Sequence, residues 1–369
     1  MLQRLYIHNF RCLENFEFTL KEIPCSLLIG KNGSGKSTIG VVLEIFQSIG
    51  RGIHRVDDLV RPKDFAYGRS HLPMRFEIEV LLNNKLYKYS LVLELPETFK
   101  ELRISQEKLL VEGETIYSRE QGQITLYSPK EARFIVDWHF VAIPIIHIQK
   151  QSEADPLSIF RTWLARMIIL TPIPSLMTGN SNGETLQPTR NSLNFGAWFS
   201  GLLGQYPAAY KQIDEYLQKV MPDISDIKNE LIGKDSKSMI VGFEKKDANF
   251  SLSFDELSDG EKCFFLCAVV VSANQYYGPL LCFWDEPDNY LSLSEVGHFI
   301  TSLRRTFKKG GQLLATSHNE ETIRKFPYEN IFVLDRKSHL EPTLIRLLSD
   351  LSIKEDMLVD TLIRGDIEL

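Results

Sequence analysis

Apolar and polar residues alternate along much of the first 140 residues of the chain. A period of two over residues 2–9 and 15–20 predicts two strands, residues 26–29 predict a short apolar strand, and residues 36–49 have the spacing of a helix. From residue 74 to about 140 the alternation returns in segments that are separated by polar turns. We therefore expect an antiparallel β lobe after the first helix.

The last third of the chain, residues 251–335, follows a different pattern in which helices alternate with apolar strands. This order predicts an α/β arrangement with a parallel sheet. Helices are expected at residues 261–275, 292–308 and 320–325, and strands at residues 280–284, 312–316 and 331–334. After residue 336 we expect a strand and then a helix.

Helical patterns that are interrupted by prolines occupy residues 155–231. Each proline breaks or kinks an interior turn of a helix, so one long coiled coil is excluded in this region. The changes of pattern along the chain predict three segments, which are residues 1–150, residues 151–250 and residues 251–369.

Composition and charge exclude several classes of protein. The 369 residues are 43% hydrophobic and 24% charged, which excludes most disordered and fibrous proteins. The net charge of −6 does not indicate nucleic-acid binding, so any such contact must come from a local patch or from a partner. No apolar run approaches the roughly 20 residues that span a bilayer, and we expect no membrane association.

The cysteines and the N-terminus bear on the compartment. The five cysteines are odd in number and include no C-x-x-C pair, which favours a reducing, cytoplasmic compartment in which the thiols are small buried apolar groups. The first sixteen residues alternate and lack an apolar core segment, so they do not resemble a signal peptide.

Residues 30–37 read Gly-Lys-Asn-Gly-Ser-Gly-Lys-Ser, a complete G-x-x-x-x-G-K-[ST] pattern between a predicted strand and a predicted helix. The glycines allow successive N–H groups to point at a phosphate, and the following helix adds its positive end. Lys36 would hold the β- and γ-phosphates of a nucleotide, and Ser37 would bind Mg²⁺. The alternative is a glycine-rich turn without a ligand.

Two adjacent acids follow the apolar strand at residues 280–284. The carboxyl end of a buried parallel strand is the edge at which ligands bind in open α/β sheets. Asp285 would reach Mg²⁺, and Glu286 would act as general base toward an attacking water. Alternatively, the two acids only end a strand at the turn before Pro287.

Two shorter signals accompany these motifs. Residues 257–261, Leu-Ser-Asp-Gly-Glu, precede a long apolar helix and would expose a second helix N-terminus to an anion. A well-capped helix, with Ser258 or Asp259 as the cap, is the structural alternative. His318 follows the strand at residues 312–316, at the same sheet edge as Asp285, and could touch a γ-phosphate. A lone histidine more often has a structural role.

In chain order, these four motifs resemble those of ABC-type ATPases. Residues 30–37 look like Walker A, residues 257–261 like the LSGGQ-like signature, residues 280–286 like Walker B with its catalytic acid, and His318 like the switch histidine. The chain is most similar to the RecF-like and SMC-like AAA-domain ATPases of bacteria, many of which belong to antiphage defence systems, including Septu-like and retron-associated ones. Residues 7–11, Ile-His-Asn-Phe-Arg, match the N-terminal strand of these proteins, and residues 194–198 give a weaker match.

The resemblance implies an α/β fold, that of an ABC-type P-loop ATPase with an antiparallel β lobe and a helical insertion between Walker A and the signature. The three segments would then be an N-terminal ATPase half, the insertion and a C-terminal ATPase half. ATP and Mg²⁺ are the implied ligands, and two subunits would pair head to tail as a homodimer or a higher oligomer. Ser258 and Gly260 would then act on the nucleotide of the partner subunit.

The resemblance also assigns the site residues. Glu286 and His318 are the implied catalytic residues, and Ser37, Asp285 and Gln149 the implied metal ligands. The nucleotide would be bound by Gly30, Asn32, Gly33, Ser34, Gly35, Lys36, Ser37, Thr38, Ser258, Gly260, Gln149 and Arg11. Gln149 is the choice for the Q-loop glutamine, Gln151 is a competitor, and an ordinary surface glutamine is an equal alternative for either. After Walker B the chain reads Pro-Asp-Asn-Tyr-Leu-Ser, where relatives commonly have a Leu-His-Pro ending.

The resemblance implies a compact ATPase that acts with a separate effector, a nuclease or toxin, in antiphage defence. The alternatives are a RecF-like DNA repair or recombination ATPase, and a slowly hydrolysing scaffold that holds a toxin or nuclease inactive. A membrane transporter's ATPase is disfavoured because its signature normally follows the P-loop more closely. One loose cluster of basic residues comprises Arg51, Arg55, Arg61, Lys63 and Arg69 with His54 and His71. Acids lie among these residues, so a solvent-exposed face without a ligand is the default interpretation.

Overall fold

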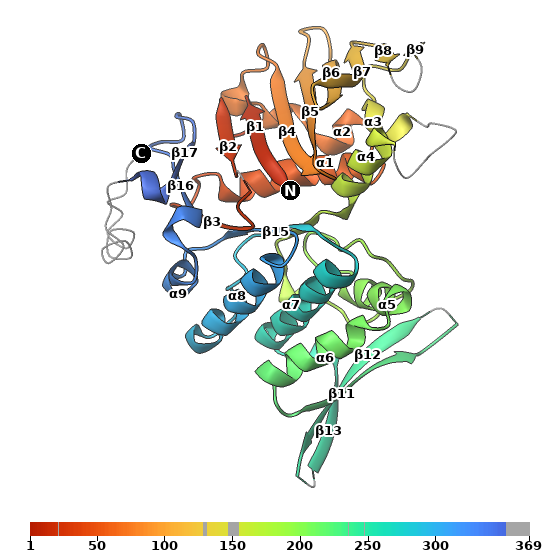
Figure 1. The fold of residues 1–369 in the computed structure, drawn as a ribbon, viewed down its shortest axis with the longest axis vertical. Helices are drawn as coiled ribbons and strands as arrows, with labels where there is room; N and C mark the ends of the chain where they lie inside the picture. Colours follow the sequence, from red (N-terminus) through yellow and green to blue (C-terminus); the bar gives the residue numbers. More distant parts are fainter. Residues whose placement is uncertain (21, 128–130, 147–154, 235, 247, 352–369) are drawn as a thin grey trace. The chain divides into compact units, whose positions relative to one another are not determined.

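The computed structural model describes residues 1–369 except residues 21, 128–130, 147–154, 235, 247 and 352–369. The chain divides into two compact units (Figure 1). The first unit contains Met1–Met167 and Pro327–Leu369, and the second contains Ile168–Phe326. The sequence predicted three consecutive segments, whereas the first compact unit combines two separate stretches of the chain. The three segments stay a prediction.

An eight-stranded antiparallel sheet dominates the first unit, with strand order β2-β1-β4-β5-β6-β7-β8-β9. Its strands are β1 (Leu2–His8), β2 (Phe16–Thr19), β4 (Met74–Leu82), β5 (Lys85–Glu94), β6 (Arg103–Val111), β7 (Glu114–Glu120), β8 (Gln123–Leu126) and β9 (Ala132–Ile135). Asn83 and Asn84 have φ angles of 49° and 58° and form the β4–β5 turn, because asparagine tolerates the left-handed conformation that a tight hairpin requires. The predicted antiparallel lobe is confirmed, and the first two strands of the chain join it.

Two helices pack on this sheet, α1 (Lys36–Gly50) and α4 (Pro156–Arg166). Tyr89 of β5 lies between them, with its ring centroid 6.0 Å from that of Phe46 and 5.7 Å from that of Phe160. A Cβ atom on Gly50 would lie 2.5 Å from the backbone nitrogen of Ala165, so only glycine allows α1 and α4 to approach so closely. The short helix α3 (Ala142–Ile145) contacts both of them, and another short helix, α2 (Val56–Leu59), follows α1 in the chain.

The first unit also contains a smaller group of strands. β3 (Cys25–Ile29) pairs in parallel with β16 (Ile331–Asp335), and β17 (Leu344–Leu347) pairs antiparallel with β16. All five residues of β3 are buried, as its apolar sequence predicts. The strand expected after residue 336 is therefore present, whereas residues 352–369, where the terminal helix is expected, lie outside the described part of the chain.

The second unit has a parallel sheet with strand order β10-β14-β15, formed by β10 (Ile168–Leu170), β14 (Leu281–Trp284) and β15 (Gln312–Thr316). Its helices are α5 (Phe195–Gln205), α6 (Ala209–Val220), α7 (Asp259–Tyr276), α8 (Leu293–Phe307) and α9 (Glu320–Arg324). α7 packs between α6 and α8, and nearly all of its residues from Lys262 onward are buried. The helices and strands expected over residues 261–334 are confirmed to within about three residues.

One prediction was wrong at the end of the region expected to be helical. Ile224–Leu231 is a strand, β11, and it forms a three-stranded antiparallel sheet with β12 (Lys237–Lys245) and β13 (Ala248–Ser253). A bulge between Ile224 and Asp226 places the buried side chains of β11 at Ile224 and Ile227. This spacing of three residues is typical of a helix, and most of β13 is exposed, so the alternation that marks a strand is weak.

The five cysteines are all free and buried, as the sequence predicted. Burial, together with the nearby Asp259 carboxylate, raises the pKa of the Cys263 thiol to about 12. Among the described helices, none is both long enough and apolar enough to cross a bilayer.

A buried ion pair lies inside the β lobe. Glu107 accepts hydrogen bonds from the hydroxyls of Tyr89 (2.9 Å) and Tyr117 (2.8 Å) and from the backbone N–H of Ala142. Arg119 lies 3.7 Å from the same carboxylate, and neither side chain is exposed. Burial raises the pKa of Glu107, while the charge of Arg119 and these hydrogen bonds oppose that shift.

We predict that Glu107→Ala lowers the free energy of unfolding by about 3–5 kcal/mol, because it leaves the buried Arg119 charge without a carboxylate beside it and with only backbone carbonyl oxygens as acceptors. The matched control is Glu94→Ala, which removes the acidic partner of Arg103. This ion pair is more exposed than that of Glu107, so its loss should cost about 1 kcal/mol or less. Urea unfolding followed by circular dichroism measures both values. Equal losses in the two variants would contradict a special role for the buried pair.

Candidate functional site

The glycine-rich loop at residues 30–37 lies in the first unit, between β3 and α1. Gly30, Gly33 and Gly35 have φ angles of 149°, 80° and 99°, which residues with a side chain rarely adopt. A Cβ atom on Gly30 would lie 2.1 Å from the carbonyl oxygen of Leu334 in β16, so this position requires glycine. Around Gly33, in contrast, a Cβ atom would meet nothing within 4 Å, so the tip of the loop is open.

Lys36 lies inside the curl of this loop. Its Nζ donates hydrogen bonds to the carbonyl oxygens of Gly30 (2.7 Å) and Lys31 (3.3 Å), and the side chain is buried. The hydroxyl of Ser34 is also buried, and it has no hydrogen-bond partner in the described part of the chain. The loop therefore holds one cation and one unpaired hydroxyl close to its backbone.

The backbone N–H groups at the start of α1 are not capped by a side chain of the described residues. The N-cap of α1 is Gly35, whereas α4 and α7 are each capped by a side chain. The N–H groups at such an end carry partial positive charge and favour an anion. Ser37 is exposed on this first turn, and Thr38 accepts a hydrogen bond from the Cys12 thiol at 3.8 Å.

The segment after β1 packs against this loop. A Cβ atom on Gly35 would meet the Cys12 sulfur at 2.9 Å and the Thr343 hydroxyl at 3.1 Å. Arg11, a sequence-predicted nucleotide ligand, donates from Nε to Asp64 at 2.9 Å, and its side chain is 42% exposed. Arg11 therefore already has an acidic partner in the first unit.

Asp285 and Glu286 lie in the second unit, directly after β14. Asp285 is buried and accepts a hydrogen bond of 2.6 Å from the Thr316 hydroxyl, at the end of β15. The same hydroxyl accepts a hydrogen bond of 3.0 Å from the backbone N–H of Glu286. The Thr316 hydroxyl thus holds the side chain of Asp285 and the backbone of Glu286.

Glu286 has a φ angle of 51°, a conformation that a residue with a side chain adopts only under constraint. Its Oε2 accepts a hydrogen bond of 2.6 Å from the Asn289 amide, and its Oε1 lies 3.7 Å from Nε2 of His318. The side chains of Glu286 and His318 are 37% and 43% exposed, so both are accessible. The structure brings together the acid and the histidine that the sequence placed at one sheet edge.

A small pocket of about 220 Å³ borders the two acids within the second unit. Thr171, Cys263 and Tyr290 are among the residues that line it. Because the pKa of the Cys263 thiol is raised to about 12 by burial and by Asp259, this side chain contributes a neutral wall.

Asp288 is an acid that sequence reasoning missed. It is 5% exposed, and it accepts hydrogen bonds from the hydroxyls of Ser317 and Thr322, the latter at 2.6 Å. These contacts tie the loop after β14 to the loop that carries His318. The signal that could have found Asp288 and Thr316 is that both lie at the ends of neighbouring parallel strands, where polar side chains meet.

The segment at residues 257–261 forms the N-terminus of α7. Ser258 and Glu261 make a capping box, in which the Ser258 N–H donates to Glu261 at 2.7 Å and the Glu261 N–H donates to the Ser258 hydroxyl at 3.4 Å. The structural alternative for Ser258 is therefore present in the molecule. A Cβ atom on Gly260 would lie 3.0 Å from the carbonyl oxygen of Tyr290, so the α7 N-terminus adjoins the loop after β14.

For the remaining predicted site residues, the structure adds little to the sequence. Gln149 and Gln151 lie outside the described residues. Asn32 is exposed at the tip of the glycine-rich loop. In the described ranges, no group of three or more His, Cys, Asp and Glu side chains could hold a metal ion by itself.

A family model described as "AAA domain, putative AbiEii toxin, Type IV TA system" matches residues 25–324. This range contains the glycine-rich loop and the ends of β14 and β15. The chain belongs to this AAA-domain family. A second model, described as an AAA domain, matches residues 4–40 of the chain, from β1 to the first turn of α1. No curated protein sequence matches the chain.

Two solved structures show the same fold as this AAA-domain protein. One is an SMC head bound to the C-winged helix domain of ScpA, with 13% identity and a TM-score of 0.56, and the match covers 95% of this chain and 98% of that one. The other is an SMC head domain with an extended coiled coil, bound to the C-terminal domain of ScpA and derived from Pyrococcus furiosus. It has 12% identity and a TM-score of 0.57, with 98% and 99% of the two chains covered. The chain thus has the mixed α/β fold of the SMC head, which is the fold of ABC-type P-loop ATPases.

We predict that Asp288→Ala destabilises the second unit by about 2 kcal/mol, because the Ser317 and Thr322 hydroxyls lose their buried acceptor. Asp288→Asn keeps an acceptor oxygen and should lose less. Urea unfolding gives the stability, and hydrogen exchange should show faster exchange for the amides of residues 316–323 in Asp288→Ala. Unchanged exchange there would contradict the proposed tie between the two loops.

Proposed function

We propose that this AAA-domain ATPase hydrolyses ATP with Mg²⁺, using Lys36 and Ser37 to hold the nucleotide and Glu286 to activate the attacking water. One observation carries the proposal. The buried Thr316 hydroxyl fixes Asp285 and the backbone of Glu286, while the Glu286 carboxylate stays accessible beside His318. A restrained and accessible carboxylate next to a histidine is the arrangement that a general base requires.

The glycine-rich loop supports the binding half of the proposal. Its open tip, the uncapped start of α1 and the unpaired Ser34 hydroxyl offer donors to phosphate oxygens, and Lys36 adds a positive charge. The residues that we propose around the nucleotide are Gly30, Asn32, Gly33, Ser34, Gly35, Lys36, Ser37 and Thr38. When it is bound, Mg²⁺ neutralises phosphate charge, and Ser37 and Asp285 are the side chains that would hold it.

The proposed chemistry needs few protein groups. Glu286 accepts a proton from water as the water attacks the γ-phosphorus, and the bond between this phosphorus and the β–γ bridging oxygen breaks so that ADP leaves. Asn289 keeps the carboxylate oriented through its hydrogen bond of 2.6 Å. His318 stands beside the same carboxylate and would donate to the phosphate oxygens.

The proposal extends to two subunits and a separate effector. Ser258 and Gly260 would close over the nucleotide of a second copy, and the nucleotide state would be passed to a nuclease or toxin in antiphage defence. A partner protein is supported in general terms by the family's description as a toxin of a toxin–antitoxin system and by the two similar SMC heads, each of which is bound to a domain of ScpA.

We predict that Glu286→Gln binds ATP normally but loses at least about 100-fold in hydrolysis rate, because the amide keeps the shape of the side chain and cannot accept a proton. Nucleotide affinity is measured with a fluorescent ATP analogue and turnover by phosphate release. The control is Glu295→Gln, which alters a capping acid at α8 in the same unit. Wild-type turnover in Glu286→Gln would exclude this residue as the base.

A second prediction separates a composite site from an isolated glycine-rich loop. Ser258→Arg should keep initial ATP binding but block hydrolysis, because the arginine obstructs the surface that closes over the second nucleotide. Loss of the capping box alone costs about 1 kcal/mol and leaves turnover of the folded fraction unchanged. Ser253→Arg, at a second capping box in the same unit, is the matched control for that cost.

Mixing Ser258→Arg with Lys36→Ala tests action between subunits. Lys36→Ala alone should not bind or hydrolyse ATP. In a head-to-tail pair of the two variants, one site combines an intact loop with an intact signature, so the mixture should regain part of the activity that each variant lacks. Full hydrolysis by Ser258→Arg alone would exclude the composite site.

A further inference from the structure

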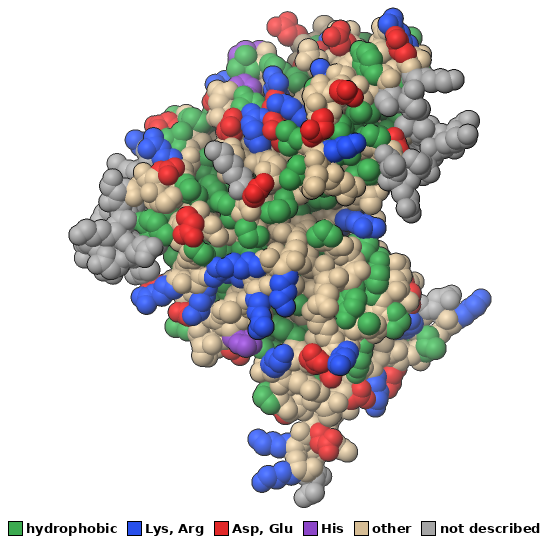
Figure 2. Space-filling view, viewed as in Figure 1, with side chains coloured by type: hydrophobic (Ala, Val, Ile, Leu, Met, Phe, Trp, Pro, Cys, Tyr) green, Lys and Arg blue, Asp and Glu red, His purple; other side chains and the backbone are tan. Residues whose placement is uncertain are grey.

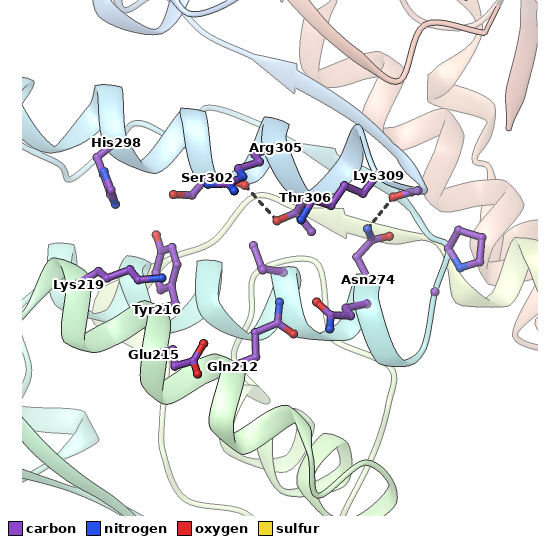
Figure 3. Close-up of a pocket in the computed structure, with 15 residues that line it drawn as sticks. Gln212, Glu215, Tyr216, Lys219, Asn274, His298, Ser302, Arg305, Thr306 and Lys309 are labelled. Carbon is purple, nitrogen blue, oxygen red and sulfur yellow. Dashed lines mark hydrogen bonds between the residues drawn. The ribbon is translucent and has the colours of Figure 1, made fainter.

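A polar groove of about 810 Å³ lies between α6 and α8 of the second unit, with the C-terminal half of α7 as its floor. Figure 3 shows Ser302, Arg305 and Lys309 on the α8 side and Gln212 and Lys219 on the α6 side. Asn274 of α7 closes the floor by donating to the Gly310 carbonyl at 2.7 Å and accepting from the Leu280 N–H at 2.9 Å. The ATPase proposal assigns no role to this groove.

Three cations line the groove without acidic partners. Lys219, Arg305 and Lys309 make no ion pair and no side-chain hydrogen bond with any residue that the structure describes. One carboxylate, Glu215, also lines the groove, and it pairs with Lys211 at 3.8 Å. Figure 2 shows Lys and Arg side chains gathered over α8, with a histidine at their edge.

Some basic residues elsewhere in the chain are paired with acids. In the loose cluster that the sequence suggested, Arg55 pairs with Glu101 at 3.4 Å and Arg69 with Glu14 at 2.5 Å. The groove therefore offers unpaired positive charge, although the chain as a whole has a net charge of −6. A local patch of this kind is what an acidic protein needs to attract an anionic partner.

Helix dipoles explain only part of this arrangement. Arg305 lies in the last turn of α8 and Lys219 in the last turn of α6, where cations are favourable. The dipole of each helix accounts for its own cation, but it does not require that both cations line one groove. His298, Ser302 and Arg305 are spaced at four and three residues, so they share one face of α8 and rise about 10 Å along it.

The uncharged residues of the groove indicate the class of partner. The lining adds hydroxyls at Ser302 and Thr306 and amides at Gln212, Asn274 and Gln275. The Gln212 Oε1 is buried and has no hydrogen-bond partner among the described residues, so the groove still has polar capacity to fill. Arg, Lys, Ser, Thr, Asn and Gln are the side chains that contact the phosphates of nucleic acids.

The same lining disfavours two other partners. Protein interfaces bury aromatic and apolar anchors and are depleted in lysine, whereas this groove is mainly polar. Single-stranded nucleic acid stacks its bases on exposed aromatic faces, and the aromatic ring here, Tyr216, is only 8% exposed. We infer that the α6–α8 groove binds the phosphate backbone of a double-stranded nucleic acid.

The test compares two double variants of the full chain. Arg305→Gln with Lys309→Gln removes two groove cations, and Lys245→Gln with Lys246→Gln removes two exposed cations from the β12–β13 hairpin of the same unit. Fluorescence anisotropy measures the binding of a short labelled DNA duplex over a series of salt concentrations. The groove variant should bind roughly tenfold more weakly at about 0.1 M salt, and its log K against log salt slope should be smaller by about 2, while the control matches the wild type.

Further arms identify the source of the phosphates. An RNA duplex that binds through the same two cations supports recognition of the backbone. Failure of the wild type to bind any duplex at low salt, equal binding by the groove variant and the wild type, tighter binding of a single strand of the same sequence, or stronger binding of polyglutamate would each overturn the inference. ATP turnover without nucleic acid, measured in parallel, should be the same in all three proteins, so this inference and the proposed ATPase function succeed or fail separately.

Discussion

The hydroxyl of Thr316 makes the contacts on which the arrangement of Asp285 and Glu286 in the second unit depends. It donates to Asp285 and accepts from the backbone N–H of Glu286, so one side chain joins the ends of two neighbouring parallel strands. The left-handed conformation of Glu286 is held by this contact and by the turn that follows. Asp288 adds a second connection between the same two loops through Ser317 and Thr322. Buried hydrogen bonds therefore restrain the two loops from which the exposed side chains of Glu286 and His318 extend.

The parts of the site that the sequence predicted are those with local causes. The loop at residues 30–37 needs glycines for its backbone, and the acids follow an apolar strand whose burial is evident in its composition. Thr316 and Asp288 were missed because their importance arises only when β14 and β15 pair. β11 was missed for a different reason, since its bulge gives it the buried spacing of a helix. The two compact units were also out of reach, because Pro327–Leu369 returns to the first unit after a long excursion of the chain.

Charge is distributed unevenly over the chain, and net charge hides this. In the first unit, arginines such as Arg4, Arg11 and Arg69 meet carboxylates within hydrogen-bond distance, so their positive charge is largely cancelled locally. On the α8 side of the groove, Arg305 and Lys309 have no such partner in the part of the chain that the structure describes. The sequence stretch Arg304-Arg305 followed by Lys308-Lys309 was a visible signal for this surface, but only the packing of α6 beside it makes a groove.

Ser258 shows that a structural role and a proposed functional role can belong to one side chain. Its hydroxyl and N–H both engage Glu261, which stabilises the first turn of α7 in an isolated subunit. The same contacts hold Ser258 at an exposed position near Gly260. A side chain in place of Gly260 would press on the carbonyl oxygen of Tyr290. A preformed helix end costs no ordering entropy when an anion arrives, because its N–H groups are already aligned. The capping box is therefore compatible with the proposed composite site, and it would supply the preorganisation that such a site requires.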